Sequence, residues 1–376
     1  MQRQLHLAFF LPSLAGGGAE RIVTTLANAL VERGHHVDLL LASKQGPLES
    51  AVDSRVSLRD FGQKHTAYTI PALVRLLRRR QPDVVVTALL HATVAATGAL
   101  RWIQHWDQHA PSLCATVHSL PTVLSANAAG LRARILMRIA RPVLQNIDTI
   151  VGVSHTVARD LSHFASLSPS DIRVIPNPID VGAIQTAAKA PCPHKWLQED
   201  PPVIVAAGRL SPEKQYPTLL RALAHLHTKR LTRALILGKG PERDSLVALR
   251  DELHLRSHVS FLGFLENPYP AFSRADLVVL PSPAEAFGNV VVESLACGTP
   301  VVAMDDSGGP VEILENLNAN YSPLSSSSPS ALADAIDAAL EAQINTDALQ
   351  HRAWDFEVSS IVDRYISLLN RIAHST

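Results

Sequence analysis

The sequence predicts an α/β protein made of two doubly wound domains that face one another across a cleft. The chain has 376 residues, more than a single hydrophobic core usually organises. Hydrophobic residues make up 47% of the chain and charged residues 18%, which is enough apolar material for two cores. Short apolar runs alternate with amphipathic stretches in both halves, as parallel strands do when helices connect them.

Eleven apolar runs are the candidate strands of these domains. Their nearly continuous Val, Ile and Leu residues are typical of strands covered on both faces of a parallel sheet. The runs are residues 5–11, 37–42, 84–87, 113–117, 149–153 and 172–175 in the first half, and 203–207, 234–237, 259–262, 277–280 and 301–303 in the second. Ligands of such sheets bind where loops leave the carboxyl ends of the strands. We therefore expect the functional residues in the loops that follow these runs.

The boundary between the domains is expected shortly after Asn177-Pro178. Residues 187–202 are polar and contain four prolines, as interdomain linkers often do. We place the first domain at residues 1–183 and the second at residues 184–355. A C-terminal helix at about residues 356–376 is expected to pack back on the first domain.

Composition argues against several classes of function. Lys plus Arg and Asp plus Glu both number 34, so no net field recruits nucleic acid. The three cysteines form no CxxC pair, which is typical of a reducing cytoplasm and offers no structural zinc site. The longest apolar stretch, residues 84–100, is interrupted by polar residues and is shorter than the roughly 20 residues that span a bilayer. The N-terminal apolar run predicts a first strand rather than a signal peptide, because a glycine loop follows it at once. We therefore expect a cytoplasmic location.

Glycine-containing loops follow several predicted strands. Gly16-Gly17-Gly18 precedes a helix whose free N–H groups can meet an anion or a hydroxyl. Because these glycines are contiguous, they do not match the G-x-G-x-x-G pattern of a dinucleotide site. Gly238 opens a similar turn, and Ser307-Gly308-Gly309-Pro310 repeats the pattern. Each signal alone also fits a simple tight turn.

Two cations follow the first strand of the second half. Gly208-Arg209-Leu210 comes directly after this strand, and Lys214 follows five residues after Arg209. An arginine fork and a lysine point charge on one loop can hold a diphosphate. The alternative is a solvated loop, but the position after the first strand of the domain favours a binding site.

The segment 281–302 carries the strongest signal. Glu285 lies in the loop after a strand, and a helix that begins near Asn289 carries Glu293. A loop carboxylate can accept hydrogen bonds from sugar hydroxyls, and a helix carboxylate can accept two from a ribose. A surface ion pair is the default for any single glutamate. The pair of acids, with a glycine and proline cap after the helix, favours binding.

A histidine ends a strand in the first half. His118 follows the predicted strand at residues 113–117 and is expected on the ligand edge, where a neutral imidazole can contact a sugar. A structural histidine is the more common alternative for any lone residue of this type. His91, after the strand at residues 84–87, competes for the same role.

Together these residues resemble glycosyltransferase family 4, retaining enzymes of the GT-B fold, which consists of two Rossmann-like domains. The resemblance covers nearly the whole chain. Glu285 and Glu293 fit the E-x7-E pattern of the family, and Arg209 with Lys214 is similar to its diphosphate-binding pair. The N-terminal glycine loop is similar to that of members that build bacterial surface polysaccharides and lipopolysaccharide. Ala286 stands where members commonly have glycine, so the sugar pocket is expected to differ slightly.

The resemblance implies a role for each candidate residue. Arg209 and Lys214 would neutralise the leaving diphosphate, Glu293 would bind the ribose and Glu285 the donor sugar. His118 would contact the sugar from the first domain. The remaining contacts to the donor or acceptor would come from Gly17, Gly18, Gly208, Gly238, Phe287, Gly288 and Asn289. No metal and no other cofactor is implied, because the two cations do the work of a metal ion.

The implied activity is a retaining transfer in bacterial cell-surface polysaccharide synthesis. A hexose or N-acetylhexosamine would move from a UDP- or GDP-sugar to a hydroxyl of a glycan or lipid-linked acceptor. One alternative is a nucleotide-sugar 2-epimerase of the same fold, which would need further acid–base carboxylates that no motif supplies. Another is a catalytically silent nucleotide-sugar-binding protein, against which the four intact charged residues argue.

A basic amphipathic helix is predicted at residues 130–144. Its arginines lie beside an apolar face at helical spacing and comprise Arg132, Arg134, Arg138 and Arg141. Such a helix can lie on an anionic membrane surface, although an ordinary helix with a solvated basic side fits equally well. A second cluster comprises Arg75, Arg78, Arg79 and Arg80. The sequence therefore suggests peripheral docking at the inner face of the plasma membrane.

Overall fold

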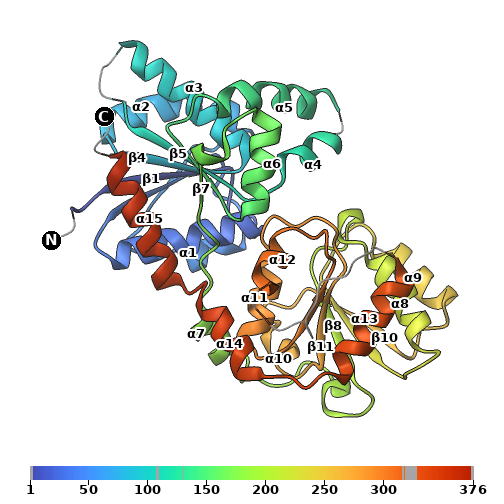
Figure 1. Cartoon of the computed structure of the whole chain (residues 1–376). Helices are drawn as coiled ribbons and strands as arrows, with labels where there is room; N and C mark the ends of the chain where they lie inside the picture. Colours follow the sequence, from blue (N-terminus) through green and yellow to red (C-terminus); the bar gives the residue numbers. More distant parts are fainter. Residues whose placement is uncertain (1–2, 107–109, 129, 316, 318–327, 374–376) are drawn as a thin grey trace. The chain divides into compact units, whose positions relative to one another are not determined.

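The structure is a computed structural model that describes residues 3–106, 110–128, 130–315, 317 and 328–373. It divides into two compact units (Figure 1). Unit 1 comprises Met1–Pro178 and Val358–Thr376, and unit 2 comprises Ile179–Glu357. The chain thus passes from unit 1 into unit 2 between Pro178 and Ile179, whereas the sequence places this boundary after residue 183.

Unit 1 is built on a parallel sheet of seven strands in the order β3-β2-β1-β4-β5-β6-β7 (Figure 1). On the interior strand β1, Phe9 pairs with Leu39 on one side and with Val86 on the other. All three side chains are buried, as expected of strands covered on both faces. The strands are β1 (His6–Leu11), β2 (His36–Leu41), β3 (Ser57–Asp60), β4 (Val84–Ala88), β5 (Ser112–Val117), β6 (Thr149–Gly152) and β7 (Ile172–Val174).

Helices cover both faces of this sheet (Figure 1). One buried cluster joins the sheet to α1 and α15, and another joins it to α2 and α3. Helix α5 packs beside α3, so α2, α3 and α5 form one layer. The helices of unit 1 are α1 (Gly18–Glu32), α2 (Ile70–Arg80), α3 (Leu90–Trp106), α4 (Pro121–Ala126), α5 (Leu131–Leu144), α6 (His155–Ala165) and α15 (Val358–Ile372).

Unit 2 repeats the same architecture with five parallel strands in the order β10-β9-β8-β11-β12. The strands are β8 (Val203–Ala207), β9 (Arg233–Leu237), β10 (Val259–Gly263), β11 (Leu277–Leu280) and β12 (Val301–Ala303). The helices are α7 (Val181–Ala187), α8 (Tyr216–Leu226), α9 (Arg243–Glu252), α10 (Tyr269–Phe272), α11 (Asn289–Ala296), α12 (Gly309–Leu314), α13 (Pro329–Glu341) and α14 (Thr346–Trp354).

The two chain crossings between the units lie side by side. Ile179 forms a parallel bridge with Glu357, and its N–H donates to the carbonyl of Phe356 at 2.9 Å. The N–H of Val181 donates to Glu357 Oε2 at 3.0 Å. The chain therefore leaves unit 2 beside the point at which it enters.

A buried carboxylate joins two elements of unit 1 at the edge where the strands begin. Asp38 on β2 accepts hydrogen bonds from Arg80 Nη2 at 2.7 Å and pairs with His6 Nε2 at 2.8 Å. Burial would raise the pKa of Asp38, but the hydrogen bonds to His6 and Arg80 outweigh it and hold the pKa well below its usual range. The guanidinium of Arg80 is therefore engaged by the buried Asp38.

Candidate active site

The strand order places the candidate site of unit 2. The first strand of the unit, β8, lies between β9 and β11, and the connections run to opposite sides of it. In doubly wound sheets the ligand crevice lies outside the carboxyl ends of the two strands at this switch point. The loop after β8 carries Arg209 and Lys214, and the loop after β11 carries Glu285. The structure thus brings the three predicted residues to one edge of the sheet.

An ion pair connects these two loops. Lys214 Nζ contacts Glu285 Oε1, and the two side chains are 24% and 15% exposed. Arg209, in contrast, is exposed and its guanidinium makes no ion pair within the described part of the chain. Both cations are therefore present on the loop, with the lysine held by a carboxylate and the arginine open to solvent.

Close backbone packing shapes the loop after β8. A side-chain carbon on Gly238 would collide with the carbonyl of Gly208, and one on Gly240 would collide with that of Leu210. The N–H of Leu210 donates to the carbonyl of Lys239 at 3.0 Å. Gly238 has a φ of +142°, a conformation that favours glycine. Because Gly238 has no side chain, its loop can pack closely against the loop that carries Arg209.

The loop that carries Glu285 is fixed by a second loop. Glu285 forms a parallel bridge with Gly308. Its N–H donates to the carbonyl of Ser307 at 2.7 Å, and its carbonyl accepts from the N–H of Gly309 at 3.0 Å. A side-chain carbon on Gly309 would lie 2.5 Å from the Cα atom of Phe287. The backbone of the Ser307–Gly309 loop therefore positions the Glu285 carboxylate.

Helix α11 begins directly after this loop and places the second glutamate. Its N-cap Gly288 has a φ of +92°, and Asn289 begins the helix as predicted. Glu293 lies one turn further along and is half-buried. The Phe287 side chain is buried and packs edge-on against Phe356, with ring centroids 5.5 Å apart. The ring of Phe287 is therefore part of the core, and only the backbone of this residue is available to a ligand.

In the glycine loop of unit 1, Gly17 lies against the carboxylate of Glu20. Gly17 is the N-cap of α1, and Glu20 lies in the first turn. A side-chain carbon on Gly17 would collide with Glu20 Oε2. A carboxylate at this position already complements the positive end of the helix dipole and disfavours a second anion there. The loop formed by Gly16, Gly17 and Gly18 therefore suits a hydroxyl better than a diphosphate.

His118 lies at the end of β5, and its protonation state follows from its neighbours. The Thr116 hydroxyl donates to the carbonyl of Thr87 at 3.0 Å, and Thr116 Oγ1 lies 3.0 Å from His118 Nε2. Since the single hydroxyl hydrogen is used by Thr87, the ring nitrogen Nε2 must carry the hydrogen of the second bond. Burial lowers the pKa of His118 from 6.5 to about 4, against a smaller opposing effect of Asn177. His118 is thus neutral near pH 7, and its unprotonated Nδ1 is buried.

Four residues of the two ligand edges have no counterpart among the residues predicted from sequence. Thr116 orients His118, as described above. Tyr216 is buried beside Gly208, and its pKa is raised by burial and by the charge of Glu285. The hydroxyls of Ser282 and Ser307 are buried and make no hydrogen bond within the described residues. Ser282 and Ser307 lie in loops that follow strands, whereas Thr116 lies within β5 and Tyr216 begins α8, so no local pattern marks the four together.

Comparisons with known proteins identify both halves of the chain. The model "Glycosyltransferase Family 4" matches residues 16–182, and the model "Glycosyl transferases group 1" matches residues 193–354. The first match covers unit 1 from residue 16 to Pro178 and ends four residues into unit 2, and the second lies in unit 2. Together they cover most of both candidate sites.

Curated relatives with known names are similar over part or most of the chain. The lipopolysaccharide core biosynthesis glycosyltransferase LpsE of Rhizobium meliloti is 29% identical over 78% of this chain and 77% of its own length. An N-acetylgalactosaminyltransferase of Campylobacter jejuni that acts on a diphospho-undecaprenol-linked sugar is 35% identical over 44% of each chain. A D-inositol 3-phosphate glycosyltransferase of a Mycobacterium species is 32% identical over 61% of this chain and 54% of its own length. The chain thus spans about half the length of two of these relatives.

Solved structures share the fold over the full length of the chain. The Anabaena protein Alr3699/HepE in complex with UDP-glucose matches with a TM-score of 0.80 at 20% identity, covering 98% of this chain and 100% of that one. A glycosyltransferase of Rickettsia africae matches with a TM-score of 0.76 at 17% identity, covering 100% of both chains. At this level of identity the likeness establishes the fold, and the sites must be argued from this chain's own residues.

Proposed function

The chain belongs to the glycosyltransferases of family 4, with a group 1 domain as its second half, and from this premise we propose that it transfers a sugar from a nucleotide donor. The donor is a UDP- or GDP-linked hexose or N-acetylhexosamine, and the acceptor is a hydroxyl of a glycan or lipid-linked glycan. The fold is GT-B, with two Rossmann-like units. The observation that carries the proposal is the meeting of Arg209, Lys214 and Glu285 at the switch point of unit 2.

The charges of this cluster suit a departing nucleoside diphosphate. Negative charge develops on the diphosphate as the bond to the sugar breaks, and fixed cations stabilise that charge where it forms. Arg209 is open to solvent and can offer a planar fork to a phosphate, while Lys214 supplies a point charge. When the diphosphate takes over as the partner of Lys214, the Glu285 carboxylate is free to accept hydrogen bonds from the sugar. Glu293 on α11 would accept those of the ribose. No metal ion and no further cofactor is proposed.

The residues of unit 1 suit contacts with hydroxyls. Glu20 at the start of α1 disfavours a second anion and can accept a hydrogen bond from an acceptor hydroxyl. His118 is neutral and partly exposed at the end of β5, where its ring can contact the transferred sugar. These features support a role of unit 1 in binding the acceptor and the transferred sugar, rather than the diphosphate.

The relatives support a place in the synthesis of bacterial surface glycans. LpsE is named for lipopolysaccharide core biosynthesis, and the Campylobacter enzyme for a lipid-linked acceptor. We infer that the transfer retains the anomeric configuration, with the leaving phosphate assisting deprotonation of the acceptor hydroxyl. Proton NMR of the product tests this directly, since an inverted anomer would contradict it.

Peripheral association with the inner face of the plasma membrane is part of the proposal. No helix in the described ranges is both long and apolar enough to cross a bilayer. Helix α5 is amphipathic, and its exposed apolar residues Leu131, Ile135 and Ile139 lie among its arginines. Such a surface suits an anionic membrane on which a lipid-linked acceptor is presented. The protein would then act from the cytoplasm.

A donor panel tests the function. We expect one UDP- or GDP-sugar to raise the melting temperature, and nucleotide release from it to depend on an acceptor and to persist in EDTA. A 2-epimerase would instead interconvert the donor sugar without acceptor, and a silent binding protein would bind the donor and release nothing. Absence of stabilisation by any nucleotide would contradict the proposal as a whole.

Replacing Thr116 by valine is expected to reduce turnover by roughly five- to tenfold, the equivalent of one lost hydrogen bond. Valine keeps the shape of threonine but removes the oxygen that orients His118 Nε2, so the ring no longer has a fixed tautomer. Steady-state kinetics and titration with UDP or GDP check this prediction. Binding of the free nucleotide should stay unchanged, and Thr116→Ser should restore turnover. A purely structural role would lower the melting temperature and leave kcat unchanged in the folded fraction.

A further inference from the structure

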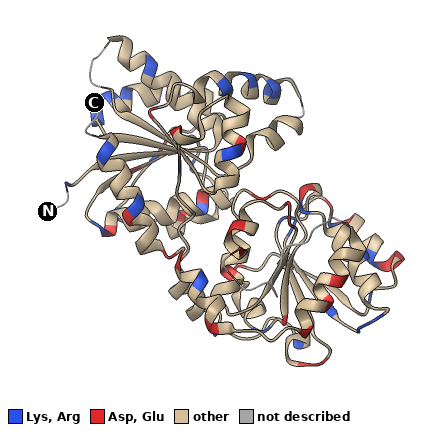
Figure 2. Cartoon of the chain, viewed as in Figure 1, with Lys and Arg blue, Asp and Glu red and all other residues tan. Residues whose placement is uncertain are grey.

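The layer formed by α2, α3 and α5 in unit 1 gathers apolar and basic residues on one surface. Of ten large hydrophobic side chains that are exposed in the described residues, five lie on α3 or α5. Residues 61–147 contain ten Lys and Arg residues but only two acids, although the whole chain is balanced. Figure 2 shows basic residues along both α2 and α5. The exposed apolar residues and the excess of basic residues thus lie in unit 1, and the candidate donor site lies in unit 2.

A groove lies within this layer between α2 and α3. Its volume is about 750 Å³, which falls within the roughly 300–1,000 Å³ of small-molecule sites. Its lining consists of the apolar side chains Ile70, Pro71, Val74 and Trp102 and of the three arginines Arg75, Arg78 and Arg79. The groove therefore offers an apolar wall and a cationic rim to a single ligand.

The three arginines are available for a partner. Arg75, Arg78 and Arg79 are exposed and make no hydrogen bond or ion pair within the described ranges. Their neighbour Arg80 is committed to Asp38. Like charges three and four residues apart on a helix repel one another, so an anion bound between them would relieve this repulsion. The rim thus favours a phosphate.

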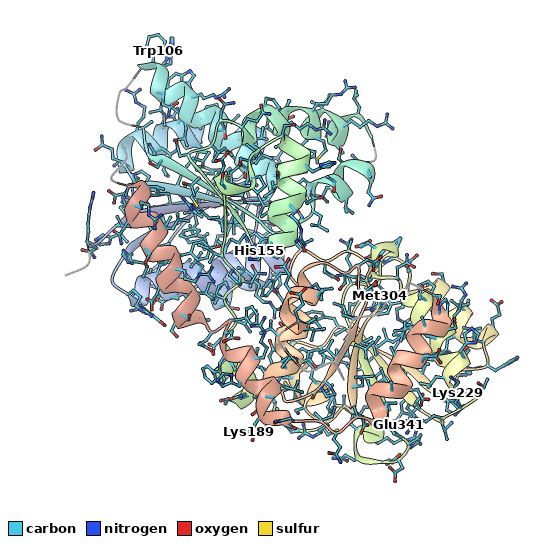
Figure 3. The ribbon with its side chains drawn as sticks, viewed as in Figure 1. Trp106, His155, Lys189, Lys229, Met304 and Glu341 are labelled. Carbon is cyan, nitrogen blue, oxygen red and sulfur yellow. The ribbon has the colours of Figure 1, made fainter. Side chains whose placement is uncertain are left out.

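Two tryptophans extend the apolar wall along α3. Trp102 and Trp106 are one turn apart, with ring centroids separated by 6.4 Å, and are 50% and 67% exposed. Figure 3 shows Trp106 at the end of α3. Indole rings combine a large apolar area with one hydrogen-bond donor and are enriched at the boundary between lipid and water.

We propose that the α2–α3 groove binds an anionic phospholipid of a bilayer surface. The phosphate lies among Arg75, Arg78 and Arg79, and the acyl chain follows Val74 and Trp102. The site is distinct from the ligand edge of unit 1, because the last turns of both helices lie where β4 and β5 begin and His118 lies where β5 ends. It rests on the proposed membrane docking and assigns that docking a specific lipid site outside the catalytic machinery.

Tryptophan fluorescence tests the apolar part of the site. The chain has four tryptophans, of which Trp196 and Trp354 lie in unit 2. Vesicles that contain phosphatidylglycerol with brominated acyl chains should quench the fluorescence of the protein. The double variant W102F/W106F should lose most of this quenching, whereas the matched control W196F/W354F should retain it. Equal quenching in both double variants would overturn the proposal.

Charge reversal tests the rim. R75E/R78E should weaken binding to phosphatidylglycerol vesicles at least about tenfold, since each cation near an anionic surface strengthens binding several-fold. R221E/R256E carries the same change of charge on exposed positions of unit 2 and should bind as the wild type does. The lipid site would be overturned if both variants lost the same binding affinity for these vesicles. It would also be overturned if the wild type bound phosphatidylcholine vesicles equally well, or if a single-stranded oligonucleotide competed with the vesicles.

The outcome separates this inference from the proposed function. Donor cleavage with a water-soluble acceptor is measured without vesicles and needs only the transferase sites. A protein that transfers sugar but whose tryptophans are not quenched would overturn the lipid site alone. Quenching by the brominated lipid without stabilisation by any nucleotide sugar would overturn the proposed function alone.

Discussion

Replacing Lys214 by alanine is expected to lower kcat/KM for the donor by about 100- to 1,000-fold. This is the size of effect seen when one preorganised group that stabilises developing negative charge is removed. Lys214 also neutralises Glu285, which is only 15% exposed. The variant should therefore lose about 1–2 kcal/mol of stability as well, because a largely buried carboxylate is left without its partner. Initial rates and urea unfolding measure the two effects separately.

Two further variants control this experiment. Lys229→Ala removes a lysine from an exposed ion pair with Asp334, away from the candidate site, and should leave both quantities nearly unchanged. Lys214→Ala combined with Glu285→Gln should recover most of the stability and none of the activity, since the neutral amide needs no cation. Activity of Lys214→Ala within twofold of the wild type would mean that the loop after β8 does not bind the diphosphate.

The second large effect is a difference between the two glutamate variants, one of which should lose nucleotide affinity and the other turnover. Glu293→Ala should weaken binding of the free nucleotide by about 10- to 100-fold, because an ionised carboxylate that accepts two ribose hydroxyls makes charge-assisted hydrogen bonds. Glu285→Ala should instead reduce kcat by about 100-fold and change nucleotide affinity less than tenfold. Calorimetric titration with UDP and GDP, together with steady-state kinetics, distinguishes the two variants.

Glu252→Ala is the matched control for these glutamates. Glu252 is exposed at the end of α9, outside the candidate site, and its loss should affect neither affinity nor turnover. If Glu285→Ala and Glu293→Ala had the same profile, both carboxylates would contact the same part of the donor. The assignment of ribose and sugar to separate residues would then be wrong.

The strands of both units could be predicted because their burial leaves a direct trace in the sequence. All eleven predicted runs form strands, since strands covered on both faces must be apolar throughout. The twelfth strand, β3, was missed. It consists of Ser57–Asp60 at the edge of the sheet, and half of its residues are exposed, so no apolar run marks it.

The candidate residues could be predicted one by one, but their contacts could not. Lys214 and Glu285 are 71 positions apart, and only the strand order brings them to the same edge of the sheet. The effect of Glu20 on the glycine loop depends on a side-chain position at the start of α1. The tautomer of His118 depends on a hydroxyl two residues away and on a carbonyl of the neighbouring strand. Such pairings are set by tertiary packing and not by local pattern.

The return of α15 to unit 1 has a consequence for the order in which the chain matures. Ile361, Tyr365 and Leu369 belong to the buried cluster that also contains α1 and the centre of the sheet. During synthesis this cluster stays incomplete until residues 358–372 have left the ribosome, whereas unit 2 is continuous in sequence. Domains usually fold from the N-terminus onward. Here the ribosome synthesises all of unit 2 before unit 1 can close its core, so unit 1 completes its fold last although it begins the chain.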